Sequence, residues 1–283
     1  MLDQLSAVSD TALLTLFCRA MISARNRQLL YDPLAESFVE QLIEPLSHSL
    51  RPMARRLTRW KIDRQLAIYI SMRAVRCDQY ARDFIAAHPD AQIVNIACGL
   101  DTRHVRVPRP PDVDFYDLDL PPMIALRRTL VDETDRYHML ATSALEVAWM
   151  DELDPSRPTL LIAEGLFMYL PIEHVRALVL AAYDRLPGSQ LVCEVFNRRW
   201  LQPPLDKLVN MSLRQKLSFG DGAEFRSGLS DSAQMESWAE GMRLLGDWSF
   251  VDAPPPGLRA LRAMRHFEWL RQMQWIVHYQ LGS

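Results

Sequence analysis

The stretch that most constrains the fold is an apolar segment, residues 92–97, which runs directly into a turn of small residues that contains Gly99. A second apolar segment, 113–119, ends in Asp119, about 20 residues after this glycine, which is the separation expected for a ribose-binding acid. A third apolar segment ends in the lone acid Glu164, followed by another glycine. The three strand ends together predict a site for a nucleotide-type cofactor.

Beyond residue 91, candidate strands alternate with helical stretches, which predicts an α/β fold with a parallel, Rossmann-like sheet. The candidate strands are 92–97, 113–119, 137–141, 159–164, 190–196, 243–251 and 273–281. Residues 1–90 carry apolar positions at helical spacing and few strand signals, so we expect an N-terminal helical cap before a core at 91–283. A polar, irregular segment at about 197–242 breaks the alternation, and we expect it to be an inserted lid before the last two strands.

Composition and charge restrict the kinds of partner. The net charge of −3 argues against a nucleic-acid partner, because phosphate neutralisation needs a concentrated basic surface. One basic stretch, 51–64, contains Asp63 as its only acid and is either a docking site for an acidic partner or a solvated helix face. We therefore expect no nucleic-acid partner.

The cysteines and the N-terminus indicate the expected compartment. Four cysteines are widely scattered and form no CxxC pair, so neither a zinc site nor a disulfide framework is predicted. The N-terminus carries an acid where a secretory signal carries basic residues, and no apolar run approaches the 18 residues needed to span a bilayer. We expect a cytoplasmic protein without a membrane partner and without a metal.

The turn chemistry favours an adenosine ligand over a dinucleotide. Gly99 allows close backbone approach to a ligand, and Asp119 can accept hydrogen bonds from two neighbouring ribose hydroxyls. The G-x-G-x-x-G fingerprint of dinucleotide sites is absent, because positions 97, 99 and 102 are Ala, Gly and Thr. An adenosine ligand without phosphates fits this turn, and S-adenosylmethionine is the commonest such cofactor.

Several motifs, taken in order, resemble the leucine carboxyl methyltransferase family, in the branch that contains bacterial polyketide-synthesis O-methyltransferases. The motifs are 97–103 (ACGLDTR), 117–121 (DLDLP) and 162–171 (IAEGLFMYLP), with Arg19-Ala20, 32–35 (DPLA) and 275–279 (WIVHY) nearer the ends. The resemblance covers most of the chain. It implies a class I methyltransferase fold, S-adenosylmethionine as cofactor and S-adenosylhomocysteine as product.

The resemblance also implies which residues bind the cofactor. Arg73 would bind the methionine carboxylate, and Ala97 and Gly99 would form the glycine turn. Asp119 would bind the ribose, and Ser143 and Ala144 would contact the adenine. Glu164 would lie near the sulfonium end of the cofactor. Two departures from the family pattern are present. Position 97 is Ala where the family has Gly, and Ser143-Ala144 replaces an acidic residue followed by an apolar one.

Each assignment has a structural alternative. Asp119 can face water or cap the next helix, and Arg73 can be an ordinary surface charge or ion-pair member. Asp101 and Arg103 can simply cap and brace the helix after the turn. Glu164 is harder to explain structurally, because a buried carboxylate is costly without a partner.

The expected reaction is displacement at the methyl carbon by an acceptor oxygen. A carboxylate acceptor is already ionised at neutral pH and needs no general base, whereas a phenol needs one. The sequence contains no compact base arrangement, although His174 or His266 can be brought in by the fold. No catalytic residue is assigned, and Arg19 and Tyr169 are the candidates for binding the acceptor, since a guanidinium pairs with a carboxylate through two bonds.

Three functions remain open from the sequence. The first is an O-methyltransferase for a natural-product carboxylate or hydroxyl. The second is a protein C-terminal carboxyl methyltransferase, which a wide groove lined by the basic stretch 51–64 would favour. The third is a cofactor-binding protein without catalysis. The sequence is compatible with a monomer or a homodimer.

Overall fold

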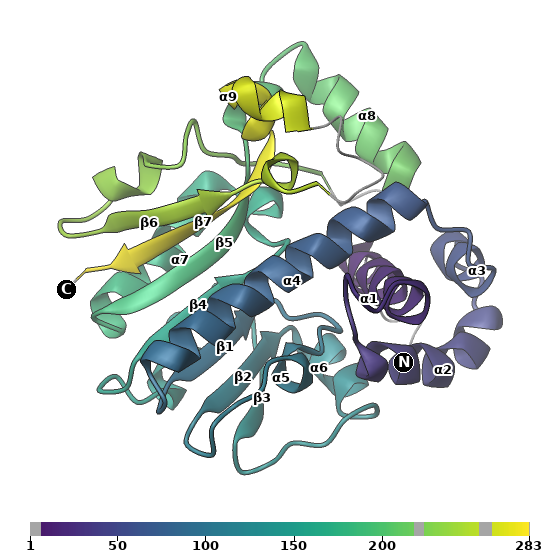
Figure 1. Ribbon diagram of the computed structural model, residues 1–283, viewed down its shortest axis with the longest axis horizontal. Coiled ribbons are helices and arrows are strands. Elements are labelled where there is room, and N and C mark those ends of the chain that lie inside the picture. The colour runs from purple at the N-terminus through teal and green to yellow at the C-terminus, as the bar shows by residue number, and fades with distance from the viewer. Residues whose placement is uncertain (1–6, 218–223, 255–261, 283) are drawn as a thin grey trace.

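The computed structural model describes residues 7–217, 224–254 and 262–282. Its strands are β1 (Gln92–Ile96), β2 (Asp114–Asp119), β3 (Tyr137–Ala141), β4 (Thr159–Ala163), β5 (Ser189–Phe196), β6 (Arg243–Trp248) and β7 (Gln274–Leu281). Within the described residues these strands form one sheet in the order β3-β2-β1-β4-β5-β7-β6. β1 to β5 are parallel, and β7 lies antiparallel between β5 and β6 (Figure 1). The predicted Rossmann-like α/β fold is confirmed.

The strand order reverses at β1, which defines where a ligand binds. From β1 the chain first builds outward through β2 and β3, and it then returns to the other side of β1 with β4 and β5. Ligands in open parallel sheets bind beyond the carboxyl ends of the strands at such a reversal. The turn after β1 and the ends of β2 and β4 therefore face one site.

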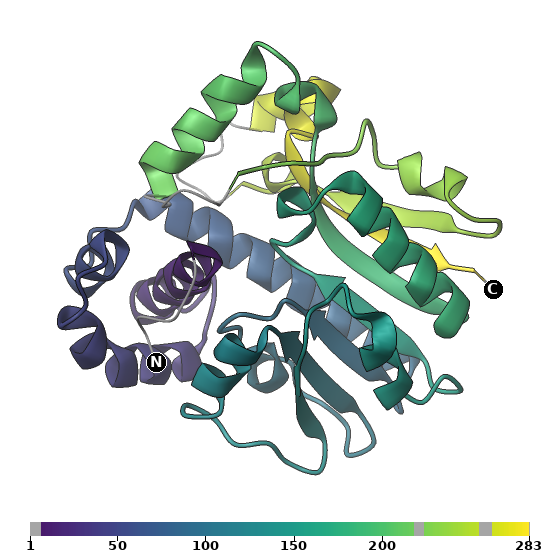
Figure 2. The same ribbon diagram turned by 180° about the vertical axis from the view of Figure 1, so that it is seen from behind.

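Helices cover both faces of the sheet. α4 (Arg64–Ala87) lies across one face and α7 (Ile172–Arg185) across the other, as the front and back views show (Figure 1, Figure 2). Neighbouring strand residues point to opposite faces, so Ile93 packs in the core beside α4 and Val94 in the core beside α7. In the described part of the chain, no helix has both the length and the hydrophobicity needed to span a bilayer.

The helices expected in residues 1–90 are present and pack directly on the carboxyl edge of the sheet. α1 (Ala7–Arg25), α2 (Pro33–Ser47) and α3 (Pro52–Thr58) share one hydrophobic core with the first half of α4. Leu100, after β1, and Met123 of α6 (Pro121–Arg127) belong to the same core. The cap is thus fastened to the turn after β1, and α4 continues from the cap onto the sheet.

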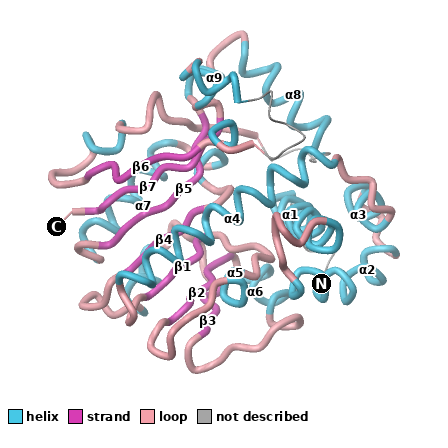
Figure 3. Tube along the Cα trace, in the orientation of Figure 1, coloured by secondary structure: helices cyan, strands magenta, loops and turns pink. Residues whose placement is uncertain are grey.

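The segment 197–242, expected to be a lid, contains a short helix and irregular structure. α8 (Leu205–Leu217) occupies its first half, and the loop-rich remainder follows (Figure 3). The Phe219-Gly220-Asp221-Gly222 stretch lies outside the described residues. The chain then returns to the end of β5 at Gly228, where a Cβ atom would lie 2.3 Å from the Phe196 carbonyl oxygen. Only glycine allows this close return.

The strand predicted at 243–251 ends earlier, at Trp248. Ser249 is extended and begins the short 3-10 helix Phe250–Asp252, and its backbone N–H donates to Asp252 Oδ2 at 2.8 Å. This capping box competes with continuation of the strand. The turn brings Phe250 to the wall of the ligand cavity.

Candidate functional site

A cavity of about 1010 Å³ runs along the carboxyl edge of the sheet. At one end it is lined by residues that follow β2 and β3, and at the other by the first turns of α4 and by residues that follow β4. Leu120 and Leu145 line the first end. Tyr69 and Tyr169 line the second. The residues predicted to hold the ribose and the adenine line the first end, and we call the second end the acceptor half.

The turn after β1 has an unusual backbone. Ala97 and Gly99 adopt φ values of 55° and 53°, in the left-handed region that disfavours residues with a Cβ atom. At Gly99 a Cβ atom would lie 3.0 Å from the Cβ of Ala12 in α1. The glycine therefore permits the close approach of α1, the first helix of the cap. Ala97 adopts this conformation despite its Cβ atom, at the cost of backbone strain.

Asp119 is held at the end of β2 by two backbone donors. Its Oδ2 accepts from the Gly99 N–H and its Oδ1 from the Leu120 N–H, both at 2.7 Å. Leu120, not Asp119, is the N-cap of α6, so the helix-capping alternative does not apply. Burial raises the pKa of the Asp119 carboxyl. Asp119 lines the cavity and links the end of β2 to the glycine turn.

Ser143 and Ala144, predicted to contact adenine, follow β3 and line the same end of the cavity as Asp119. The Ser143 Oγ accepts from the Leu145 N–H at 3.2 Å, and the Ala144 carbonyl accepts from Trp149 Nε1 at 3.2 Å. These bonds fix the backbone of the segment. The predicted contact of Ser143 and Ala144 with adenine stays a prediction.

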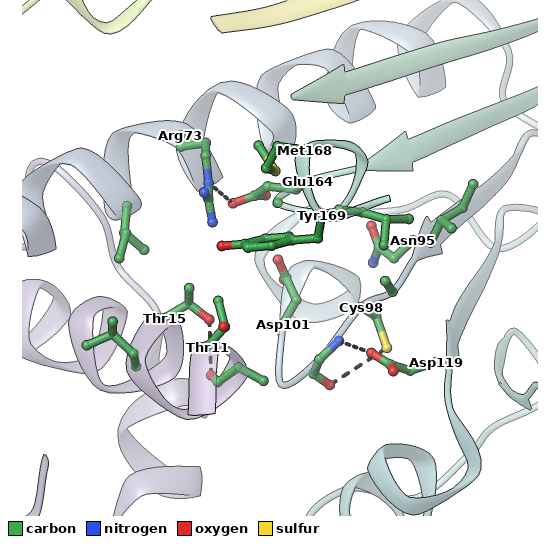
Figure 4. A pocket seen from close by; sticks show the side chains of 18 of the residues that line it. Thr11, Thr15, Arg73, Asn95, Cys98, Asp101, Asp119, Glu164, Met168 and Tyr169 are labelled. Carbon is green, nitrogen blue, oxygen red and sulfur yellow. Dashed lines mark hydrogen bonds and ion pairs between the residues drawn. The ribbon is translucent and has the colours of Figure 1, made fainter. Parts of the chain in front are cut away.

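Glu164 and Arg73 form an ion pair in the middle of the cavity (Figure 4). Arg73 Nε donates to Glu164 Oε1 at 2.8 Å, and Arg103 Nη2 donates to Glu164 Oε2 at 2.6 Å. Burial raises the pKa of the Glu164 carboxyl, but the two arginine charges outweigh it and hold the pKa below its ordinary value. The Arg73 guanidinium lies over Gly165, where a Cβ atom would be 3.5 Å from Nη2. Arg73 is thus a largely enclosed cavity residue, with 11% of its side chain exposed, and not a surface charge.

Glu194 is a site residue that the sequence reasoning missed. It lies within β5, is 1% exposed, and accepts from Arg73 Nη1 at 2.8 Å and from the Tyr69 hydroxyl at 3.0 Å. Gln274 at the start of β7 also donates to it at 2.8 Å. Burial raises the pKa of the Glu194 carboxyl. The sequence contained a cue for Glu194, because this acid interrupts an apolar strand, and Glu164 had been singled out as an acid at the end of one.

A second buried network, built on Arg103 and Arg106, holds the turn after β1 against α4 and the cap. Arg103 Nε donates to Asp78 of α4 at 2.9 Å, and the Arg103 backbone N–H donates to Asp101 at 2.6 Å. Arg106 Nε donates to Asp78 at 2.7 Å, and its Nη1 donates to Asp32 of the cap at 3.0 Å. The charges of Arg103 and Arg106 hold the pKa of the Asp101 carboxyl well below its ordinary value, against burial. This network gives Asp101 and Arg103 the bracing role considered from the sequence.

Arg19, a predicted acceptor-binding residue, has other partners. Its Nε donates to Asp32 at 3.1 Å and its Nη2 to the Leu100 carbonyl at 2.7 Å, and the residue is 3% exposed. Arg19 lines the cavity, but its guanidinium fastens the cap to the turn after β1. Arg19 therefore braces the cap, and its contact with the acceptor stays a prediction.

Tyr169, the other predicted acceptor residue, reaches into the cavity. Its ring extends across the centre of the site, with the hydroxyl directed toward the space between Arg73 and Thr15 (Figure 4). The ring meets Phe225 edge-on at a centroid distance of 5.2 Å. No hydrogen bond to the Tyr169 hydroxyl is present among the described residues. Burial raises the pKa of this hydroxyl, so it remains a neutral donor.

The other sequence candidates lie away from the cavity. His174 and His266 are exposed and do not line it. From the basic stretch 51–64, Arg56 is the one arginine or lysine that does so among the described residues. The described part of the chain contains no cluster of side chains suited to hold a metal ion.

Residues 12–182, more than half of the chain, match the family model described as leucine carboxyl methyltransferase. The chain belongs to the leucine carboxyl methyltransferase family. This match includes the glycine turn, Asp119 and Glu164. The fold, the strand-end site and the family together identify an S-adenosylmethionine-dependent methyltransferase.

Individual proteins similar to this chain are also named as methyltransferases. Tetracenomycin polyketide synthesis O-methyltransferase TcmP of Streptomyces glaucescens is 30% identical over 89% of this chain and 86% of its own length. A Mycobacterium bovis protein provisionally named an S-adenosyl-L-methionine-dependent methyltransferase is 33% identical over 60% of this chain and 52% of its own length. A solved structure from Thermobifida fusca YX, provisionally named a methyltransferase, shares the fold with a TM-score of 0.58 and 16% identity, covering 90% of this chain and 99% of its own.

The cavity residues fit this cofactor. Carboxylates suited to hydroxyl and ammonium groups stand at Asp119 and Glu164, and the Arg73 cation lies between Glu164 and Glu194. The left-handed turn at Ala97 and Gly99 exposes backbone rather than large side chains to the cavity. An adenosine with a charged amino-acid tail matches this order of groups along the cavity.

Proposed function

We propose that this methyltransferase acts on oxygen, and that its acceptor is a carboxylate of a small-molecule natural product. The observation that carries the proposal is the acceptor half of the cavity, which continues beyond Arg73 and Glu164 and is lined by Tyr69, Tyr169 and Phe225. The similarity to TcmP, whose name describes a polyketide O-methyltransferase, supports an oxygen acceptor of this kind.

The size and lining of the cavity favour a small molecule over a protein. Its volume of about 1010 Å³ is at the upper end of ordinary small-molecule sites, roughly 300–1,000 Å³, and suits a cofactor with a small acceptor. A protein C-terminus would be favoured by a groove lined with the basic stretch 51–64. Arg56 alone among the described basic residues of that stretch lines the cavity, so this stretch does not form the expected groove.

The charge state of the cavity favours a carboxylate over a phenol. Glu164 and Asp101 are paired with arginines, and the charges of those arginines keep the pKa of each carboxyl low, so neither is an effective base near neutral pH. No histidine or lysine lines the cavity in the part of the chain that the structure describes. An acceptor that is already ionised removes the need for a base.

The residues of this chain contribute mainly by positioning. S-adenosylmethionine, when bound, would supply an electrophilic methyl group to the acceptor oxygen and would be released as S-adenosylhomocysteine. Arg73 and Arg103 keep Glu164 ionised, so that a negative charge faces the cationic end of the cofactor site. Tyr169 offers a hydrogen-bond donor to the acceptor, and the aromatic walls exclude water. Alignment of this kind accounts for a large share of the rate in bimolecular reactions.

The proposal is tested first by cofactor binding. Calorimetric titration with S-adenosylmethionine, S-adenosylhomocysteine and NAD should give selective binding of the two sulfur nucleosides. The Asp119→Ala variant should bind them much more weakly, and Asp112→Ala, which alters an exposed acid outside the cavity, should bind them normally. Equal binding of NAD would contradict the assigned cofactor.

The oxygen that is methylated is then identified by product stability. The protein is incubated with methyl-labelled cofactor and a panel of aromatic hydroxy acids, and the extracted product is treated with mild alkali. A methyl ester releases labelled methanol, whereas a methyl ether keeps its label. Ether products would refute the carboxylate acceptor, and cofactor binding without transfer to any acceptor would favour a non-catalytic role.

A further inference from the structure

Among the described residues, one arginine side chain in the acceptor half, that of Arg226, makes no hydrogen bond or ion pair with the protein. Among the residues that the structure describes, five arginines line the cavity, namely Arg19, Arg56, Arg73, Arg103 and Arg226. The first four donate side-chain hydrogen bonds to carbonyl or carboxylate oxygens. Within the described ranges, no side-chain hydrogen bond or ion pair involves Arg226, which is exposed. A guanidinium with five donors is therefore available at the cavity wall.

The backbone holds this arginine next to Tyr169. The Arg226 N–H donates to the Met168 carbonyl at 2.7 Å, and the Ser227 hydroxyl donates to the Phe167 carbonyl at 2.9 Å. These two bonds fasten the returning end of the insertion to the turn that bears Tyr169. The aromatic wall and the free cation thus belong to one tied unit, although they are far apart in sequence.

The aromatic wall beside this cation suits a flat ring. Phe225 packs edge-on against Tyr169 on one side and against Phe196 on the other, with centroid distances of 5.2 and 4.8 Å. Phe225 is buried, while Tyr169 remains partly open to the cavity. Edge-to-face and offset arrangements of aromatic rings are favourable at these spacings. A ring-bearing acceptor would extend this cluster.

The carboxylates that line the cavity do not satisfy Arg226. Asp101 and Glu164 pair with arginines of the buried networks, and Asp119 is held by backbone donors at the cofactor end. Asp63 accepts from the Leu66 N–H at 2.8 Å as the N-cap of α4. In the described part of the chain, the acceptor half therefore presents one cation, Arg226, without a lining carboxylate bonded to it.

We propose that Arg226 determines acceptor specificity by pairing with an anionic group of a ring-bearing acceptor whose ring lies against Tyr169 and Phe225. This inference rests on the proposed function, since it names the acceptor class of the same site. A planar guanidinium binds a carboxylate through two parallel hydrogen bonds, which fixes orientation as well as charge. Arg226 is a specificity residue and takes no part in moving a proton.

Direct binding of two matched probes tests the proposal. The probes are 3-hydroxy-2-naphthoate and 2-naphthol, which share a ring system and a hydroxyl and differ in the carboxylate. Each is titrated into the full-length protein with saturating S-adenosylhomocysteine, for the wild type, Arg226→Gln, Arg226→Lys and Arg176→Gln. Arg176 is an exposed arginine of α7 that does not line the cavity, so its variant is the matched control.

We expect Arg226→Gln to weaken naphthoate binding about tenfold and to leave naphthol binding nearly unchanged, because one charge-assisted pair is lost. Arg226→Lys should fall between the two, and Arg176→Gln should match the wild type. Equal loss for both probes, or no loss for naphthoate, would overturn the assignment. So would a wild-type protein that binds naphthoate no more tightly than naphthol.

Titration of S-adenosylhomocysteine in the same samples separates this inference from the proposed function. A wild-type protein that does not bind S-adenosylhomocysteine refutes both. Normal S-adenosylhomocysteine binding together with naphthoate binding that is insensitive to Arg226→Gln refutes the role of Arg226 alone.

Discussion

Replacing Gly99 by alanine tests how the cap and the cofactor turn are joined. Gly99 has φ 53°, and a Cβ atom there would lie 3.0 Å from the Cβ of Ala12. The left-handed conformation costs about 1–2 kcal/mol for an alanine. Forcing a methyl group against α1 adds about 1–3 kcal/mol, and alanine's smaller freedom in the unfolded chain returns about 0.4–1 kcal/mol. We expect Gly99→Ala to lower the free energy of unfolding by about 2–4 kcal/mol.

Gly188 provides the matched control. It has φ 74°, and a Cβ atom built there meets nothing within 4 Å. Gly188→Ala therefore introduces the backbone strain without the steric contact, and it should cost no more than about 1–2 kcal/mol. The two variants are compared by urea unfolding, followed by tryptophan fluorescence. The difference in their free energies of unfolding isolates the contact with α1.

A second substitution in α1 tests the same contact directly. Ala12→Gly removes the opposing methyl group, so Gly99→Ala should be less destabilising in that background than in the wild type. The Gly99 N–H also donates to Asp119, so Gly99→Ala should weaken S-adenosylhomocysteine binding, which Gly188→Ala should leave unchanged. The reasoning would be refuted if the two glycine variants lost equal stability, or if Ala12→Gly gave no relief.

Three further outcomes follow from the buried charges. Asp119→Asn should raise the dissociation constant of S-adenosylhomocysteine about tenfold or more in calorimetry, since an amide cannot accept both backbone N–H groups and ribose hydroxyls; unchanged affinity would remove its ribose role. Glu164→Gln should lower the free energy of unfolding in urea by about 3–5 kcal/mol, because Arg73 and Arg103 lose a buried partner; a loss below about 1 kcal/mol would contradict this. Burial lowers the pKa of His278 to about 4 from its ordinary 6.5, so the stability from its neutral form is present above pH 6.5 and is lost as the pH falls toward 4. When the free energy of unfolding is plotted against pH, His278→Gln should therefore reduce the slope between pH 6.5 and 5 by up to about 1.4 kcal/mol per pH unit. An unchanged slope would contradict the lowered pKa of His278.

The strands and the cofactor end of the site were predictable because their signals are local. An apolar run followed by a small residue or an acid marks a buried strand and its end, and all seven predicted strands are present. The parallel sheet brings the ends of β1, β2 and β4 to one edge, so Gly99, Asp119 and Glu164 line the same cavity. The predicted end of β6 was wrong by three residues, since Ser249 caps a short helix instead of extending the strand.

The partners of the charged side chains were not predictable, because they join elements far apart in the chain. Arg73 and Glu194 are separated by 121 residues, and Tyr69 and Glu194 by 125. The sequence suggested Arg19 as an acceptor-binding residue, and only the folded structure shows that its guanidinium donates to Asp32 and is buried beside it.

The sequence by itself determined the fold class, the cofactor edge of the sheet and the family resemblance, because strand periodicity and strand-end residues act over a few positions. The tertiary structure decided which arginines are committed to the protein and which remains available to a ligand. A guanidinium has the same chemistry in every sequence context, but its availability depends on which oxygens the folded chain places around it. Arg103 is therefore buried in an ion-pair network, while Arg226 faces the acceptor half of the cavity.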